Sequence, residues 1–372
     1  MKRQLSIVVA VAACLLVAAV SVNARELIYG SWVSPKHGLN RVALPYLFNG
    51  VAKDTGGAIT WKMVAGGQLA NSRGTPKAIR DGVMDAGFGI ANYVYNILPA
   101  TGMIFNTYVF GNDVVAASGA MMETVLLRCP ECLLEHRNYN AIPLAGYGAG
   151  PYLLMCRKNL TSVADLKGRK VRASGGGVYL MKMAGATPVA MSPAAATTAL
   201  QRGTLDCVHG AGSWIRSYGY GDVIESILTY PMGINGPAMG MHMNRKTWLS
   251  LTLDQKKAHL RYAPDVVART TIDVYIIETD AIIAGVAAKG VKLNSGGADF
   301  DRLMAKYAKS QRATNIKNAR KFGLTRADAI MTEFENAVKK WKVLSKDIGR
   351  NSDKFAAALW EEVYSKIDPN SL

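Results

Sequence analysis

Arg172 is the residue of this chain whose type and position are best suited to bind a charged ligand. It ends the short run Lys170–Arg172, which predicts a strand, and Gly175–Gly177 follow it and open a helical run. The first N–H groups of a helix have no partner within the helix and favour an anion. A guanidinium beside them can hold a carboxylate through two parallel hydrogen bonds. The pattern therefore predicts a carboxylate site where this strand ends.

The stretch from Thr161 to Trp214 contains the elements that must position Arg172. Its hydrophobic pattern switches between a period of about two and a period of about 3.6, which is typical of strands that alternate with helices. This alternation builds a parallel sheet, and open parallel sheets bind ligands at the carboxyl ends of their strands. Arg172 is expected at such an end.

Three runs in this region resemble one known family. They are Ala164-Asp-Leu-Lys-Gly-Arg-Lys-Val-Arg172, Gly185-Ala-Thr-Pro188 and Ala199-Leu-Gln-Arg-Gly-Thr-Leu-Asp206. They look like the extracytoplasmic solute-binding proteins of TRAP transporters (tripartite ATP-independent periplasmic transporters). The resemblance implies that Arg172 binds the carboxylate of a small organic acid. It also implies a periplasmic protein that delivers the acid to separate membrane subunits, which an ion gradient drives rather than ATP.

A short internal echo predicts two lobes of similar design. Residues 78–88 parallel residues 199–209: an apolar helix face stops at Gly82 or Gly203, and Asp85 or Asp206 then enters a short apolar strand. Glycine readily adopts the left-handed conformation that ends a helix. We expect the two lobes to direct strand ends at each other.

We predict an α/β protein with the two-lobe fold of periplasmic binding proteins. Residues 25–148 and 238–290 are assigned to lobe I, residues 149–237 to lobe II, and residues 291–372 to a strand and helices that pack on the lobes. The glycine-rich stretch 142–156 predicts hinge strands. The helical pattern 264–289, entered at Pro264, is long enough to span both lobes. The tail from Asp368 is expected to be loose.

Other candidate ligand-binding residues follow predicted strands. Many members of the family carry a second arginine upstream of the first; Tyr152 stands there, and a tyrosine can donate one hydrogen bond. This exchange, with the candidate aromatic residues, favours a monocarboxylate with an apolar or cyclic body. The remaining candidates are His209 and Trp214 in lobe II and Trp32, His37, Gln68, Asn92 and Tyr93 in lobe I. His209 can instead be a buried donor, Trp214 can simply pack, and Gln68 can satisfy its own loop.

The N-terminal residues predict export. Lys2 and Arg3 precede an apolar run from Leu5 to Val20 and small residues up to Ala24, so residues 1–24 read as a secretory signal peptide. A membrane anchor is the alternative, but the run is short for a span of about 20 residues. The net charge of +17 is compatible with an anionic ligand. We expect no nucleic-acid partner, because the cations are spread along the chain and export excludes most nucleic acid.

Four cysteines remain after the signal peptide, and an even number in an oxidising compartment suggests disulfides. Cys129 and Cys132 can bridge each other, and Cys156 and Cys207 lie in predicted strands that can be neighbours. A zinc site is the rival, but the paired spacing of a zinc ribbon is absent. A redox Cys-x-x-Cys is a weaker alternative, because the motif does not open a helix after a strand.

Signatures of catalysis are few. The chain has no Gly-x-Ser-x-Gly motif, no His-Glu-x-x-His motif and no phosphate-binding loop. We therefore predict a binding protein rather than an enzyme, without a metal or a cofactor. Two other classes stay open: a ligand-binding protein for a sensor or chemoreceptor, and a secreted enzyme on the same scaffold.

Overall fold

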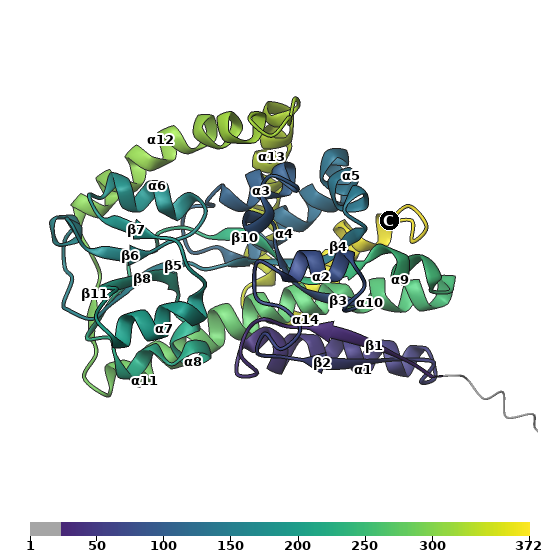
Figure 1. Cartoon of the computed structure of the whole chain (residues 1–372). Coiled ribbons are helices and arrows are strands. Elements are labelled where there is room, and N and C mark those ends of the chain that lie inside the picture. Colours follow the sequence, from purple (N-terminus) through teal and green to yellow (C-terminus); the bar gives the residue numbers. More distant parts are fainter. Residues whose placement is uncertain (1–23) are drawn as a thin grey trace, which may run out of the picture.

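The computed structural model describes residues 24–372 and contains two β-sheets flanked by helices (Figure 1). The predicted signal peptide, apart from Ala24, lies outside the described residues. The two sheets confirm the predicted two-lobe α/β architecture, and each sheet carries its own covering helices. The division of the chain into lobes at particular residue numbers stays a prediction.

The first sheet has five strands in the order β2 (Ile59–Val64), β1 (Arg25–Gly30), β3 (Ala86–Ile90), β10 (Asn235–Asn244) and β4 (Ala141–Ala149). Strands β2, β1 and β3 are parallel, and β10 runs antiparallel to both of its neighbours.

The second sheet has six strands in the order β7 (Thr187–Val189), β6 (Lys170–Arg172), β8 (Cys207–Ala211), β5 (Tyr152–Cys156), β9 (Ser226–Leu228) and β11 (Lys292–Asn294). Strands β7, β6 and β8 are parallel, and β5 runs antiparallel to β8 and β9. Each sheet therefore begins with three parallel strands followed by one antiparallel strand.

The internal echo of the sequence corresponds to one hydrogen-bonding device used twice. The Asp85 carboxylate accepts the N–H of Ile28 at 2.8 Å, and the Asp85 N–H donates to the Ile28 carbonyl. Asp206 makes the same pair of bonds with Lys170, also at 2.8 Å through its carboxylate. Gly82 and Gly203, which precede Asp85 and Asp206, end their helices with φ of 75° and 70°. In both sheets an aspartate thus ties the third parallel strand to the central one.

The two sheets are joined by extended crossings and by a long helix. Strand β4 belongs to the first sheet and β5, which follows it closely, to the second; β9 and β10 make the return. The helix runs continuously through α10 (Leu253–Arg269), η6 (Thr270–Glu278) and α11 (Thr279–Ala287). It packs on β4 at one end, and Thr279 contacts Gly212 beyond β8 at the other.

The predicted start of this helix was wrong. The helix begins at Leu253, where Thr252 and Gln255 form a reciprocal capping box, and Pro264 lies inside it rather than at its entrance. A strong N-cap outweighs one missing N–H, so the proline is tolerated about three turns into the helix.

The other helices cover the faces of the sheets (Figure 1). Around the first sheet lie α1 (Leu44–Asp54), α2 (Thr75–Arg80), α3 (Pro99–Asn106), α4 (Val114–Glu123), α5 (Pro130–Asn138), α9 (Arg245–Ser250), α13 (Ala327–Ile348) and α14 (Ser352–Glu362). Around the second lie α6 (Gly176–Met183), α7 (Pro193–Gln201) and α8 (Trp214–Tyr218), and α12 (Ala298–Arg320) packs on both α3 and α6. The remaining short helical segments are η1 (Leu39–Ala43), η2 (Ala91–Val94), η3 (Thr124–Arg128), η4 (Val163–Leu166), η5 (Tyr220–Asp222) and η7 (Tyr364–Lys366).

Two disulfides confirm the disulfide interpretation of the cysteines. Cys129 bonds to Cys132, and Cys156 bonds to Cys207. The second pair joins residues directly opposite each other on the antiparallel strands β5 and β8, with Cα atoms 4.1 Å apart. This bond ties the crossing strand to the parallel strands that carry Arg172.

The C-terminal tail is docked, contrary to our expectation. The Trp248 indole donates to the Pro369 carbonyl at 3.0 Å, Lys256 donates to Asn370 at 3.1 Å, and the Leu372 side chain is buried. These contacts are with distant parts of the chain, so the polar composition of the tail gave no sign of them.

Candidate functional site

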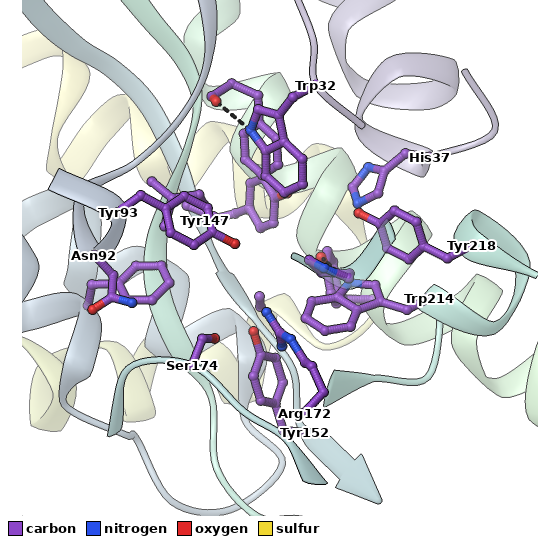
Figure 2. Close-up of a pocket in the computed structure, with 17 residues that line it drawn as sticks. Trp32, His37, Asn92, Tyr93, Tyr147, Tyr152, Arg172, Ser174, Trp214 and Tyr218 are labelled. Carbon is purple, nitrogen blue, oxygen red and sulfur yellow. Dashed lines mark hydrogen bonds between the residues drawn. The ribbon is translucent and has the colours of Figure 1, made fainter. Parts of the chain in front are cut away.

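A cavity lies between the two sheets, where Arg172 and other strand-end residues meet (Figure 2). The empty space inside it, open solvent included, is about 440 Å³. The elements around the first sheet contribute Trp32, His37, Phe88, Asn92, Tyr93 and Tyr147. Those around the second contribute Tyr152, Arg172, Ser174, Pro193, Trp214 and Tyr218, and the long helix contributes Tyr275.

Arg172 is buried and held in a fixed orientation. Its Nε–H donates to the Met191 carbonyl at 2.9 Å, and Nη1 donates to the His209 carbonyl at 3.3 Å. The guanidinium lies over the Trp214 ring, 5.1 Å from its centroid, and the side chain is only 1% exposed. No Asp or Glu of residues 24–372 lines the cavity. A buried cation without a counter-charge is unfavourable, so the site suits an anionic ligand.

Tyr152 stands on the same side of the cavity as Arg172. Its ring packs edge-on against His209 and Trp214, with centroid separations of 5.1 and 5.3 Å. Burial raises the pKa of Tyr152 above its ordinary value, although the Arg172 charge acts in the opposite direction. The hydroxyl therefore stays protonated at neutral pH and can donate one hydrogen bond to an anion beside Arg172.

Aromatic rings form the opposite wall. Trp32 stacks on Phe88 at 5.0 Å with an interplanar angle of 8°, and Phe88 stacks on Tyr147 at 6.1 Å and 14°. Tyr93 meets Trp32 edge-on at 6.2 Å. The Trp32 indole N–H already donates to the Phe88 carbonyl at 2.8 Å, so this tryptophan offers a ligand its ring rather than a donor.

The walls are built from equivalent positions of the two sheets. Phe88 and His209 each lie three residues after the paired aspartates Asp85 and Asp206. The carbonyl of Phe88 fixes Trp32, and the carbonyl of His209 fixes Arg172. One backbone device thus positions an aromatic ring in one half of the site and a cation in the other.

His37 supplies a neutral donor. Its Nδ1 accepts the N–H of Leu39 at 3.2 Å, which leaves Nε2 as the protonated nitrogen of the neutral ring. Burial, helped by the Arg41 charge, lowers the pKa of His37 to about 4. The imidazole is therefore uncharged at neutral pH and adds no second cation to the cavity.

The family comparison agrees with this geometry. Residues 31–310 match the model of bacterial extracellular solute-binding protein family 7 (DctP). The chain belongs to this family. The predicted resemblance to TRAP solute-binding proteins is therefore confirmed.

Solved TRAP solute-binding proteins share the fold of this family member. One from Rhodoferax ferrireducens T118 with benzoate has a TM-score of 0.73 at 18% identity, covering 86% of this chain and 99% of that one. One from Bordetella bronchiseptica with (R)- and (S)-mandelate has a TM-score of 0.69 at 19% identity, covering 85% of this chain and 99% of that one. One from Haemophilus influenzae RdAW with L-gulonate has a TM-score of 0.72 at 18% identity, covering 84% of this chain and 99% of that one.

A curated relative matches over a shorter stretch. The protein named "Uncharacterized protein YiiZ" from Salmonella typhimurium LT2 is 26% identical over 224 residues, which is 58% of this chain. The match covers 65% of that relative, so the chain spans slightly less than two thirds of its length.

Seven of the nine predicted site residues line the cavity of this family member. They are Trp32, His37, Asn92, Tyr93, Tyr152, Arg172 and Trp214. Whether each contacts a ligand stays a prediction.

Two of the predicted residues lie elsewhere. Gln68 is on an exposed turn after β2 and does not line this cavity, so its contact with a ligand stays a prediction without support from the geometry. The His209 ring is fully buried under Tyr152 and Tyr108, and neither of its nitrogens has a hydrogen-bond partner among the described residues. His209 acts on the cavity through its carbonyl, not its ring. Burial, followed by the Arg172 charge, lowers the pKa of His209 to about 3.

No residue of α6 lines the cavity, so the predicted anion site at its start stays a prediction. A side chain added at Gly176 would collide with the Asn106 carbonyl and the Tyr307 hydroxyl, and one at Gly177 with Tyr108. The glycines are needed because α6 packs closely against these neighbours. The cavity reaches this loop only at Ser174.

Several residues that line the cavity were not predicted from the sequence, among them Phe88, Tyr147, Tyr218 and Tyr275. Tyr218 follows Trp214 by four residues, a spacing that places both on one helix face, and this signal was readable. Tyr147 and Phe88 each stand between two glycines in or near a strand end. Tyr275 lies within the long helix, where its local pattern is that of an ordinary core residue.

The cavity adjoins a wider basic mouth. Asn92, Tyr93 and Ser174 line both spaces, and the mouth has an empty volume of about 1,290 Å³. Three exposed cations border it, Arg73, Lys182 and Lys321, and no acidic residue of the described chain does. An anion approaching Arg172 would therefore meet favourable charge first.

Residues 24–372 hold no cluster of three or more His, Cys, Asp or Glu side chains suited to a metal ion. Over the same residues, none of the helices combines the length and apolar character needed to cross a bilayer.

Proposed function

We propose that this solute-binding protein captures a small organic acid by its carboxylate, with Arg172 as the main contact. The observation that carries the proposal is a guanidinium that is 1% exposed, fixed by two carbonyls, and faces a cavity without an acidic residue in the described chain. A bound carboxylate supplies the missing counter-charge, and Tyr152 donates a further hydrogen bond to it.

The ligands of related structures support an acid as the ligand. Benzoate, mandelate and L-gulonate, bound to proteins of the same fold, all carry a carboxylate. Their bodies differ widely, from an aromatic ring to an open-chain sugar acid. The carboxylate is the feature that they share, and Arg172 is the group in this cavity suited to it.

The protein would close on its ligand like a clamp. Arg172 and Tyr152 belong to the second sheet, whereas Trp32 and Phe88 belong to the elements of the first. A ligand that touches both groups favours the arrangement in which they are close, because it gains both sets of contacts only there. The lobes are proposed as residues 25–148 with 238–290, and 149–237, with 291–372 packed on both.

Delivery to the membrane subunits of a TRAP transporter, in the periplasm, is the proposed role of the closed form. The family match supports it, and the predicted signal peptide is consistent with it. We propose binding without turnover: the acid is released unchanged. The alternatives are a protein that serves a sensor or chemoreceptor, or an enzyme on this scaffold.

A thermal-shift screen of organic acids followed by calorimetry tests the function. A ligand that binds only the folded chain raises its melting temperature by mass action. We expect at least one carboxylate to do so and to be recovered intact after incubation. Stabilisation by amines or neutral sugars alone would contradict the proposal, and chemical conversion of a bound acid would favour the enzyme.

A further inference from the structure

The charge of the cavity matches a single carboxylate. Arg172 is the one cation that lines it in the described chain, and His37 is neutral. The Tyr152 and Tyr218 hydroxyls remain protonated, because burial raises the pKa of both above the ordinary value. A second ligand carboxylate would enter this space without a partner of opposite charge, which is strongly unfavourable in a buried site.

The cavity lining is mostly apolar surface, although five tyrosines and the neutral His37 also belong to it. The Trp32 N–H is bonded to the Phe88 carbonyl, and the Trp214 N–H faces the Tyr275 hydroxyl at 3.4 Å. Asn92 and Ser174 lie where the cavity meets its mouth. Each buried hydroxyl of a sugar acid needs its own partner, and an unpaired one weakens binding.

The walls instead present ring faces and edges. Trp32, Phe88 and Tyr147 form a nearly parallel stack, Tyr93 meets it edge-on, and the Trp214 ring lies under the guanidinium. Aromatic ligands gain from stacked and edge-on contacts beyond the burial of their area.

We propose that the ligand is a monocarboxylate with a single flat, largely apolar ring, and that the cavity rejects dicarboxylates and open-chain sugar acids. The inference rests on the proposed function and adds the class of acid. The carboxylate meets Arg172 and Tyr152, and the ring lies against Trp32 and Tyr93 from the other half of the site.

Calorimetry of the mature chain with matched sodium salts tests this class. The ring acids are benzoate, mandelate and cyclohexanecarboxylate, and the open-chain acids are succinate and gluconate. We expect benzoate or mandelate to bind most tightly. Cyclohexanecarboxylate should bind about 2- to 12-fold more weakly than benzoate, because it lacks an aromatic face. Succinate and gluconate should bind at least about 100-fold more weakly.

A variant separates ring recognition from carboxylate recognition. Tyr93→Leu should weaken the binding of benzoate about 2- to 12-fold and leave the weak binding of succinate unchanged. Trp360→Leu, which removes an exposed aromatic ring that does not line the cavity, is the control and should change neither. Melting temperatures without ligand verify that both variants fold.

The outcomes distinguish the two proposals. Succinate or gluconate binding as tightly as the ring acids overturns the inference and leaves carboxylate capture standing. An equal loss of affinity for benzoate and for succinate in Tyr93→Leu also overturns it, because the contact with Tyr93 would then not be selective for a ring. If none of the three ring acids binds with a Kd below about 1 mM, which corresponds to about −4 kcal/mol, this inference fails, and the wider thermal-shift screen decides whether carboxylate capture also fails.

Discussion

Replacing Arg172 with methionine removes the one cation that lines the cavity in residues 24–372 and keeps a side chain of comparable length. A bound carboxylate would then lie in a buried site without a counter-charge. Truncating one partner of a buried, hydrogen-bonded charge pair costs about 2–5 kcal/mol. We therefore expect the Kd of the tightest acid to rise about 30- to 4,000-fold.

Arg172→Lys should recover only part of this loss. The lysine keeps the positive charge, but it loses the two-pronged hydrogen bonding of a guanidinium and the stacking on Trp214. An affinity between those of the wild type and Arg172→Met is expected for the same acid.

Isothermal titration calorimetry measures the effect, and Arg169→Met is the matched control. Arg169 also donates to two backbone carbonyls, those of Asp165 and Asn159, but it precedes β6 and does not line the cavity. It should leave Kd unchanged. An Arg172→Met protein that melts cooperatively and binds the acid within threefold of the wild-type affinity would refute the assignment.

Three further predictions follow from the described residues. First, lowering the pH from 7 to 5 should reduce the free energy of unfolding. Burial lowers the pKa of all five histidines, so below about pH 6.5 the unfolded chain takes up protons that the folded chain still refuses at pH 5. The free energy of unfolding therefore falls by up to about 1.4 kcal/mol per pH unit for each ring. Second, replacing Cys156 and Cys207 with alanine should cost about 2–4 kcal/mol of unfolding free energy in urea, because this disulfide closes a separation of 51 residues. Third, changing the three mouth cations to glutamine should slow association in stopped-flow experiments and reduce its salt dependence, with dissociation unchanged; the cations are Arg73, Lys182 and Lys321.

Each of these has its own control. In the pH series, Glu135 opposes the histidines: burial raises its pKa to about 7, so its protonation below that pH adds to the stability of the folded chain. A melting temperature that stays constant from pH 7 to 5 would contradict the prediction. The Cys129–Cys132 pair closes a separation of only 3 residues and should matter less to stability. The control for the mouth is glutamine at three exposed lysines outside it, Lys53, Lys62 and Lys289, which changes the net charge equally; equal slowing there would show a general charge effect.

The fold was predictable because its signals are local and repeated. The strand and helix periods and the glycine stops follow directly from short-range physics. The repeated sequence pattern around Asp85 and Asp206 predicted two similar lobes. In the structure, each aspartate forms the same hydrogen bond with the central one of its three parallel strands, β1 or β6. Helix boundaries were less secure, since Pro264 looked like a start although a capping box lies upstream at Thr252.

The site was only partly predictable, because a side chain's direction is a tertiary property. Residues after strands converge on the cavity, and this placed Arg172, Trp32 and Asn92 there. The same rule cannot tell a ring that faces the cavity from one that faces the core. His209 therefore counted as a candidate, although its ring is buried and only its carbonyl reaches Arg172. Tyr275 reaches the cavity from a helix distant in sequence, and no local pattern reports such an approach.

A crystal structure of the protein with its tightest-binding acid tests the central claim most directly. We expect the carboxylate oxygens within about 3.2 Å of the Arg172 guanidinium nitrogens, with the body of the acid against the Trp32 side of the cavity. An acid bound elsewhere on the molecule, or bound in the cavity with its carboxylate directed away from Arg172, would contradict the account.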